Sequence, residues 1–175
     1  MITLVLGGTR SGKSQVAERL AGEMADDVTY VATAQLDPDD PDHADRILRH
    51  RRRRPHHWTI IECRQPSDLP TALRETTGVV LVDSLGAWVT SHPDLRLDST
   101  SLVGSLAARS EPTVVVSEEV GMSIHPTTEL GRRYIDALGE LNQQVAAIAE
   151  RMLLVVAGRS IVLSHPDKPG RDPSC

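Results

Sequence analysis

Several residue types are scarce in this chain of 175 residues. It has no phenylalanine and only two tryptophans and two tyrosines, so its core must rest on Val, Leu, Ile and Ala. Its two cysteines, Cys63 and Cys175, are too few for a disulfide framework, and we expect free thiols in a reducing cytoplasm. No apolar run approaches the roughly 18 residues of a membrane span, and the opening MITLVLGG predicts a strand rather than a signal peptide. These features predict a cytoplasmic protein without a membrane span.

The chain does contain an alternation of short apolar, β-branched runs with amphipathic stretches. The runs VVLVD and TVVVS are nearly continuous, which is typical of strands covered on both faces of a parallel sheet. Two stretches, 14–25 and 129–151, repeat apolar residues at helical spacing. The alternation predicts an α/β fold, with helices on both faces of a mostly parallel sheet. Strands are expected at 2–7, 28–33, 58–63, 79–83, 113–117, 153–157 and 160–163.

The end of the chain has a different pattern. The segment LLVVAGRSIVL predicts two strands joined by a tight turn at Gly158 and Arg159, so the last strand should run antiparallel to its neighbour. Beyond it, SHPDKPGRDPSC holds three prolines in twelve residues and little apolar content, which is typical of a disordered tail. The sequence therefore predicts one domain over residues 1–163, without a linker or an internal repeat, and a tail over 164–175.

One motif near the start points to phosphate binding. Residues 7–14, GGTRSGKS, match the pattern G-x-x-x-x-G-K-[ST], with an apolar strand before them and a helical pattern after them. Glycines let the backbone curl so that N–H groups and the start of the helix face phosphate oxygens. Lys13, one of only two lysines in the chain, would contact the terminal phosphates, and the Ser14 hydroxyl would hold Mg²⁺. The predicted nucleotide-binding residues here are Gly7, Gly8, Thr9, Arg10, Ser11, Gly12, Lys13 and Ser14.

A second acidic group is expected beside the metal, at the end of another strand. The run GVVLVD ends in Asp83, which suits a carboxylate that binds Mg²⁺ next to a phosphate loop. A strand-end aspartate can also cap the helix that follows, and both interpretations stay open at this point. Ser14 and Asp83 are the predicted metal ligands.

Positive charge is concentrated in one short segment of an otherwise acidic chain. The formal net charge is −5, yet residues 46–58 hold six arginines, three histidines and no acid. On a helix, Arg46, His50 and Arg53 or Arg54 would share a face. Three interpretations remain open: a nucleic-acid or localisation patch, a solvated helix face, or an anion site with a reactive histidine. In the last, the arginines would bind a triphosphate and disfavour protonation of the imidazole, which leaves its nitrogen nucleophilic.

Further blocks of sequence make the pattern more specific. They are LVLGGTRSGKSQVAERLA, YVATAQ, RILRHRRRRPHHWTIIE, VVLVDSLGAWVT, VSEEVGMSIHP, LGRRYIDALGELNQQVAAIAE and LLVVAG, and they run over nearly all of residues 1–163. In this order they resemble the bifunctional adenosylcobinamide kinase/adenosylcobinamide-phosphate guanylyltransferase family of cobalamin synthesis. The resemblance implies a P-loop α/β domain of the RecA-like kind, assembled as a homotrimer.

The resemblance also implies a two-step activity. A nucleoside triphosphate, ATP or GTP, would phosphorylate the aminopropanol hydroxyl of adenosylcobinamide. GTP would then guanylylate a histidine with loss of pyrophosphate, and that GMP would pass to adenosylcobinamide phosphate, giving adenosylcobinamide-GDP. The family histidine lies four residues after the arginine of RI, which is His50 here. His56 and His57 do not match it, and they are interpreted as loop histidines.

The same resemblance implies the remaining site residues. Lys13 and His50 would be catalytic, and the guanine-nucleotide site would be lined by Ala32, Thr33, Ala34, Arg51, Arg52, Arg53, Arg54, Glu62 and Asp83. One departure is visible, because the family often has Asn before EVG where this chain has Glu118. That residue adds a negative charge near the expected corrinoid or metal side. Glu119 fits either substrate or metal placement or a solvent-facing role.

Two other functions fit parts of the pattern. A P-loop small-molecule kinase without nucleotidyl transfer would use the arginines and His50 only to clamp phosphates. A nucleotide-dependent nucleic-acid-binding protein would use RHRRRR as its contact. The acidic remainder and the scarcity of aromatic side chains for base stacking count against nucleic acid as a partner.

Overall fold

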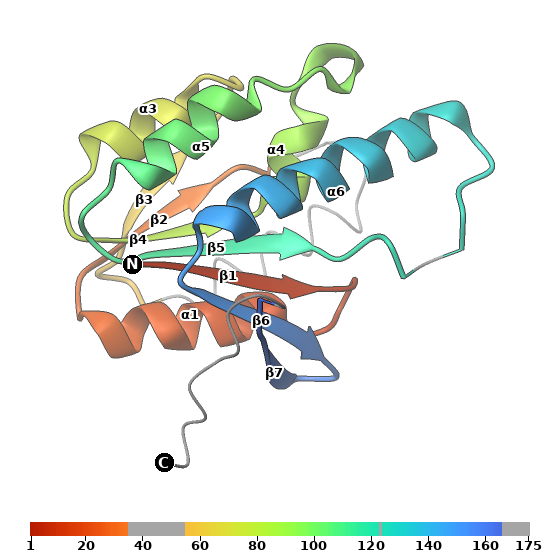
Figure 1. The fold of residues 1–175 in the computed structure, drawn as a ribbon. Helices are drawn as coiled ribbons and strands as arrows, with labels where there is room; N and C mark the ends of the chain where they lie inside the picture. The colour runs from red at the N-terminus through yellow and green to blue at the C-terminus, as the bar shows by residue number, and fades with distance from the viewer. Residues whose placement is uncertain (35–54, 123, 166–175) are drawn as a thin grey trace.

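A seven-stranded sheet forms the centre of the protein. The computed structural model describes residues 1–34, 55–122 and 124–165 (Figure 1). All neighbouring strands are parallel except the last two, which are antiparallel. The predicted α/β fold with an antiparallel last strand is therefore confirmed. In the sheet order β3-β2-β4-β5-β1-β6-β7, the strands are β1 (Ile2–Gly7), β2 (Val28–Ala32), β3 (Thr59–Glu62), β4 (Val79–Asp83), β5 (Thr113–Glu118), β6 (Arg151–Val156) and β7 (Arg159–Leu163).

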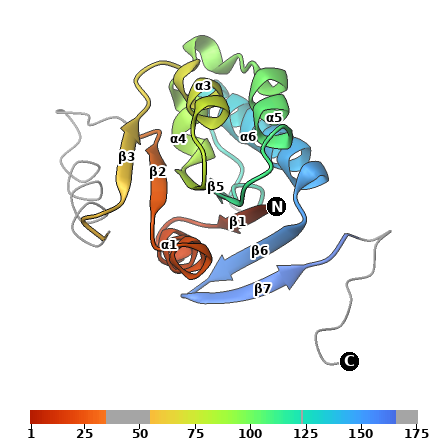
Figure 2. The ribbon, with the colours of Figure 1, turned by 90° about the vertical axis from the view of Figure 1, so that its left-hand side faces the viewer.

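Helices cover both faces of this sheet. They are α1 (Lys13–Met24), α3 (Asp68–Glu75), α4 (Leu85–Thr90), α5 (Ser99–Ala107) and α6 (Glu129–Ile148), with a 3-10 turn η1 (Pro93–Leu95) after α4. Figure 2 shows α1 on one side of the sheet and the other four helices on the opposite side. Leu4 and Leu6 of β1 belong to the core under those four helices, whereas Val5 between them packs with α1. Because both faces are covered, the central strands carry apolar side chains on both sides.

The two predicted helices are present with small shifts at their ends. The first begins at Lys13, one residue earlier than expected, and the last ends at Ile148 rather than at residue 151. It ends early because Arg151 already pairs with Thr3 as the first residue of β6. The short helices α3, α4 and α5 had not been predicted.

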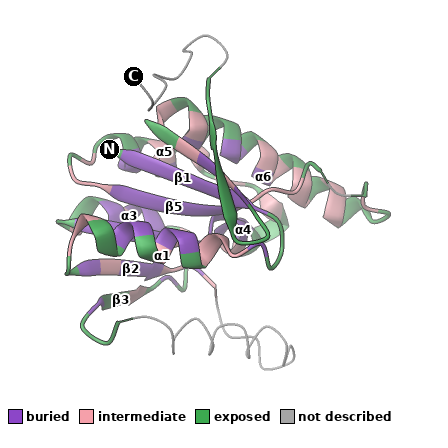
Figure 3. Ribbon diagram, turned by 90° about the horizontal axis from the view of Figure 1, so that it is seen from below, coloured by how far each residue is buried: buried purple, intermediate pink, exposed green. Residues whose placement is uncertain are grey.

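The β6–β7 hairpin turns one residue earlier than predicted. Val156 pairs with Arg159, so the turn consists of Ala157 and Gly158 rather than Gly158 and Arg159. Both turn residues have positive φ, 49° and 75°, as hairpin turns that match the twist of the strands require. The last strand, β7, is exposed along its whole length (Figure 3).

Some predictions fall on residues outside the described ranges. The segment predicted as an arginine-rich helix, including Arg46 and His50, lies there, as do Cys175 and most of the predicted tail. Cys63 is described and is a buried free cysteine, and burial, with a smaller effect of Asp68, raises the pKa of its thiol to about 12. Over the described parts of the chain, no helix has the length and apolar character needed to cross a membrane.

Candidate active site

The loop between β1 and α1 has the compact shape of a phosphate loop. Ser11 N donates a hydrogen bond to Gly8 O at 3.2 Å, and Gly12 adopts a left-handed conformation with a φ of 93° just before α1 begins. A side chain at Gly7 would collide with Ser11, because its Cβ would lie 2.5 Å from the Ser11 hydroxyl oxygen. Gly158 of the hairpin donates its N–H to Ser11 O at 2.7 Å. The loop is therefore held by its own backbone and by the neighbouring hairpin.

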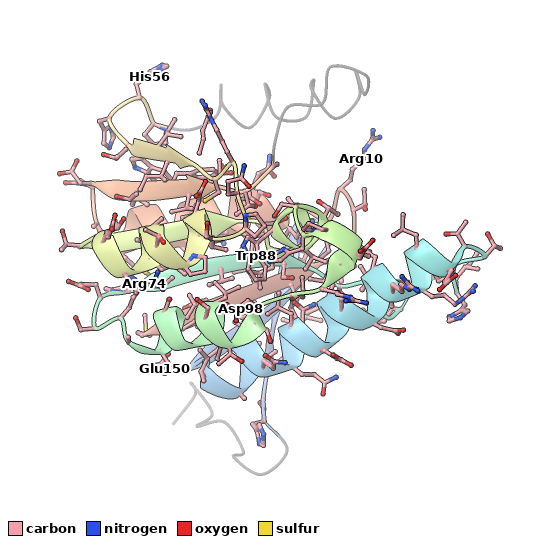
Figure 4. All side chains as sticks on the ribbon, turned by 90° about the horizontal axis from the view of Figure 1, so that it is seen from above. Arg10, His56, Arg74, Trp88, Asp98 and Glu150 are labelled. Carbon is pink, nitrogen blue, oxygen red and sulfur yellow. The ribbon has the colours of Figure 1, made fainter. Side chains whose placement is uncertain are left out.

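The tip of this loop is open to solvent. Gly8, Thr9 and Arg10 are exposed, and Figure 4 shows Arg10 pointing outward from the loop. A shallow hollow of about 270 Å³ opens on the α1 side of the loop. It is lined by Gly12, Gln15, Val16, Arg19 and Gly158. A ligand bound by its phosphates at the loop thus has free space beside it.

Lys13 lies at the start of α1, with its ammonium group turned back over the loop. Its Nζ is 3.4 Å from Gly8 O and 3.4 Å from Glu118 Oε1. Glu118 is fixed beside the loop because it pairs with Gly7 in the register of β5 and β1. The two charged side chains are 12% and 24% exposed, so solvent screens their attraction less than that of a surface pair.

Ser14 and Asp83 come together at the carboxyl edge of the sheet, which is the side where the parallel strands end. Ser14 Oγ lies 3.4 Å from Asp83 Oδ1, and Tyr30 OH donates to Asp83 Oδ2 at 2.7 Å. A hydroxyl and a carboxylate at this spacing suit Mg²⁺, which prefers oxygen ligands and keeps several waters. Among the residues that the structure describes, no three His, Cys, Asp or Glu side chains group as a metal site. An ion here would therefore depend on Ser14, Asp83, water and phosphate oxygens.

Glu118 is the second carboxylate at this edge. Ser84 Oγ lies 3.0 Å and 3.2 Å from its two carboxylate oxygens, and Gly86 N donates to Oε2 at 3.0 Å. Both donors lie at the start of α4, where the helix N-terminus favours negative charge. Glu118 thus connects the phosphate loop to the end of β4, contacts that the sequence did not predict.

The predicted segment Ala32, Thr33 and Ala34 follows β2. Thr33 is buried, and its hydroxyl donates to Ser84 O at 2.6 Å and accepts from Ser84 N at 2.8 Å. Both hydrogen-bonding roles of this hydroxyl are therefore used within the protein. Ala32 and Ala34 are only partly buried. The side chain of Thr33 holds the end of β4 in place, and a ligand would meet its neighbours instead.

Glu62 lies at the same edge of the sheet as Asp83. In the register, Ala32 pairs with Glu62 on one side and with Asp83 on the other. The three positions therefore form a row across β3, β2 and β4. Glu62 is exposed at the end of β3. The predicted guanine-site carboxylate and the predicted metal carboxylate are two strands apart.

The two described histidines of the basic segment, His56 and His57, lie at the amino edge of the sheet, which is the side where the parallel strands begin. Both precede β3, and His57 Nε2 is 2.9 Å from Asp26 O, just before β2 begins. Figure 4 shows His56 at the far end of the molecule from Arg10. Both histidines therefore lie in a loop away from the phosphate loop of the same chain. His50, Arg51, Arg52, Arg53 and Arg54 lie outside the described residues.

Four side chains at the site had not been predicted: Tyr30, Ser84, Tyr134 and Asn142. Asn142 Nδ2 donates to Glu118 O at 3.0 Å, and Asn142 Oδ1 accepts from Ser117 Oγ at 2.6 Å, so a buried amide fixes the end of β5. Burial, and then the Glu118 carboxylate, raise the pKa of Tyr134 above its ordinary value. These residues come from β2, α4 and α6, and no local spacing in the sequence links them to the phosphate loop.

Comparisons with known proteins identify the family of the chain. Residues 3–163 match the model of the family described as cobinamide kinase / cobinamide phosphate guanyltransferase. The "Bifunctional adenosylcobalamin biosynthesis protein CobP" of Pseudomonas aeruginosa is 41% identical over 167 residues, which cover 90% of this chain and 94% of that protein. The "Bifunctional adenosylcobalamin biosynthesis protein CobU" of Escherichia coli is 36% identical over 178 residues, covering 90% and 97%. The matches extend along nearly the whole chain.

Two solved structures share the fold at low sequence identity. The flagellar accessory protein FlaH from Methanocaldococcus jannaschii gives a TM-score of 0.55 at 14% identity, covering 97% of this chain and 80% of that chain. An ATPase of the type III secretion system of pathogenic bacteria gives 0.52 at 11% identity, covering 92% and 56%. They confirm the predicted P-loop NTPase fold. The match over residues 3–163 and the two bifunctional relatives show that this chain belongs to the cobinamide kinase / cobinamide phosphate guanyltransferase family, in which those relatives are named as adenosylcobalamin biosynthesis proteins.

Proposed function

We propose that this enzyme phosphorylates adenosylcobinamide with a nucleoside triphosphate and then transfers GMP from GTP, through His50, to adenosylcobinamide phosphate. The product is adenosylcobinamide-GDP. The observation that carries the proposal is the meeting of Lys13, Ser14 and Asp83 at one edge of the sheet, with Glu62 two strands away. The phosphate-binding groups and the Glu62 carboxylate thus lie along one edge, which suits an enzyme that handles a triphosphate in two reactions.

In the first reaction the loop would hold the triphosphate by its backbone N–H groups and by Lys13. Ser14 and Asp83 would hold Mg²⁺, which supplies neutralising charge at the phosphates when it is bound. The exposed tip, with Thr9 and Arg10, would close over the outermost phosphate. Phosphoryl transfer of this kind depends chiefly on positioning and charge neutralisation, and these residues supply both.

In the second reaction the His50 imidazole would attack the α-phosphorus of GTP. A P–N bond forms, the bond to the β-phosphate oxygen breaks, and pyrophosphate leaves. An oxygen of the corrinoid phosphate then attacks the same phosphorus and releases the imidazole. The intermediate divides one difficult displacement into two easier ones.

The guanine nucleotide would lie along the row at the ends of β3, β2 and β4. The Glu62 carboxylate can accept hydrogen bonds from a guanine edge or a ribose hydroxyl. Backbone groups of Ala32 and Ala34 would border the nucleotide, while Thr33 keeps the neighbouring strand end in place. The arginines at 51–54 would neutralise the departing pyrophosphate by bidentate hydrogen bonds.

We also propose that the enzyme works as a cytoplasmic homotrimer, with one catalytic domain over residues 1–163 and a tail over 164–175. The support is a set of large apolar side chains left exposed on the described surface, because such groups favour contact with further copies of the chain. They are Met122, Ile124, Leu130, Val156, Ile161 and Val162.

Radiolabelled GTP tests the proposed second reaction. The enzyme is incubated with GTP labelled on the α-phosphate or on the γ-phosphate and is then denatured. We expect label from the α-phosphate alone to stay on the protein, stable to base and lost in acid, as a phosphoramidate should be. His50→Ala should abolish it, whereas His57→Ala, at the other edge of the sheet, should leave it unchanged. A lack of covalent label in the unaltered enzyme would instead support a kinase without nucleotidyl transfer.

A further inference from the structure

The proposed function uses Asp83 and leaves Glu118 without a role. Glu118 is nevertheless the carboxylate in contact with the phosphate-loop lysine, with Oε1 at 3.4 Å from Lys13 Nζ. It ends β5, which lies between β1 with the loop and β4 with Asp83. A carboxylate in this position faces the place where the last phosphate of a bound triphosphate would lie.

The Glu118 carboxylate is held without help from Lys13. Ser84 Oγ and Gly86 N donate to it from the start of α4, and Asn142 fixes its backbone carbonyl. It should therefore stay in place when the lysine turns to a triphosphate. A carboxylate has about four acceptor positions. Once Lys13 leaves, Oε1 keeps an acceptor position free for another donor.

The surroundings of Glu118 suit an alcohol. A Cβ at Gly86 would lie 2.0 Å from Glu118 Oε2 and 2.7 Å from the Tyr134 hydroxyl, so these groups crowd around a position that only glycine can fill. The Tyr134 phenol is protonated near neutral pH and can donate a hydrogen bond. The Glu118 side chain remains 24% exposed, so a substrate group can reach it.

We infer that Glu118 positions the acceptor hydroxyl in the kinase reaction and takes up its proton. This inference rests on the proposed function. The hydroxyl oxygen forms a bond to the γ-phosphorus, the bond from that phosphorus to the β–γ bridging oxygen breaks, and the nucleoside diphosphate leaves with the electron pair. The hydroxyl proton passes to Oε1 of Glu118. Guanylylation of His50 uses no hydroxyl acceptor, so it should not need this carboxylate.

Paired variants test the inference. Glu118→Gln keeps the shape and removes the base, while Glu111→Gln removes a carboxylate just before the start of the same strand. Phosphorylation of adenosylcobinamide and self-labelling by α-labelled GTP are measured on each protein, with the kinase rate followed across pH. For Glu118→Gln we expect kcat of the kinase reaction to fall about a hundredfold or more, the loss typical of a missing general base. Nucleotide KM and self-labelling should stay within a few-fold of the unaltered enzyme.

The pH profile separates a base from a structural support. The kinase rates of the unaltered enzyme and of Glu111→Gln should decline together toward acid pH, and the rate of Glu118→Gln should lack that decline. Glu118→Asp should again show the decline in acid, with a lower kcat than the unaltered enzyme. Equal kinase rates with and without Glu118 would overturn the inference, as would a parallel loss of kinase and self-labelling. If the unaltered enzyme phosphorylates no adenosylcobinamide, the kinase part of the proposed function is wrong, and the inference about Glu118 is wrong as well.

Discussion

The two edges of the sheet use charged side chains in different ways. At the carboxyl edge, Lys13, Asp83 and Glu118 contact mainly side chains, and two of these contacts, Lys13–Glu118 and Ser14–Asp83, are 3.4 Å long, so a ligand can separate them. At the amino edge, charged groups bond to the backbone. Arg109 donates to the carbonyls of Leu73, Thr76 and Gly78 at 2.7, 2.6 and 2.7 Å.

Glu150 also lies at the amino edge, and its charged group likewise bonds to the backbone. Its carboxylate accepts the backbone N–H of Ile2 and lies 3.9 Å from the amino terminus. In Figure 4, Glu150 and His56 both lie on the left side of the molecule, well apart from each other, and Arg10 lies on the right. From this difference we expect charge to serve stability at the amino edge and, under the proposed function, ligand binding at the carboxyl edge. Variants at the two edges should therefore have opposite effects.

The largest effect should come from Lys13→Ala at the carboxyl edge. We expect both kinase activity and self-guanylylation to fall roughly a thousandfold, because both proposed reactions need the Lys13 ammonium to bind the triphosphate. The melting temperature should change little, since the contacts of the Lys13 ammonium with Gly8 O and Glu118 Oε1, among the described residues, are both 3.4 Å long. Steady-state rates and thermal unfolding of the same preparation check this. Retention of either activity would show that the two reactions do not share the loop.

Arg109→Met should give the opposite result at the amino edge. It removes a guanidinium that serves three carbonyls and the Thr113 hydroxyl, which should cost about 2 kcal/mol of unfolding free energy. The melting temperature should fall by about 4 to 8 °C, with activity per folded molecule unchanged. Arg133→Met, which breaks an exposed pair with Glu129 on α6, is the matched control and should have little effect. Equal melting of the two variants would contradict the assignment of Arg109 to stability.

The smallest effect should come from Glu150→Gln, and it should depend on pH. The hydrogen bond from Ile2 N holds the pKa of Glu150 below its ordinary value. Its contribution to stability is thus complete above the unfolded pKa and is lost as pH falls through the folded pKa. The variant should melt slightly earlier than the unaltered protein at pH 7, and this gap should close in acid. Glu140→Gln, at an exposed position of α6, should show no such gap, and a constant gap for Glu150→Gln would exclude the linkage.

Much of the fold could be predicted because the strands are buried on both faces. A continuous apolar run such as VVLVD predicts a buried strand by itself. Each predicted strand is present, and its ends lie within two residues of the predicted ones. The helices α3, α4 and α5 were missed because they are 6 to 9 residues long, too short to establish a helical period. The hairpin register was displaced by one residue because Ala157, rather than a second glycine or asparagine, takes a positive φ there.

Only the site residues that belong to a short sequence motif could be predicted. The phosphate loop and Asp83 follow from short patterns beside apolar strands. The contacts of Glu118 do not, because they depend on the register that sets β5 against β1 and on the start of α4. Thr33 was expected to line the nucleotide site, and its buried hydroxyl also donates to and accepts from the backbone of Ser84, which the sequence did not predict. These bonds join residues that are neighbours across the sheet but far apart in the sequence, and no spacing in the sequence reveals them.

Mapping the guanylylated residue tests the central claim most directly. The enzyme is incubated with GTP, digested at alkaline pH where a phosphoramidate survives, and its peptides are sequenced by mass spectrometry. The account predicts GMP on the imidazole of His50 and on no other residue. GMP found on Lys13, on His56 or His57, or on any residue while His50 stays unmodified, would contradict it.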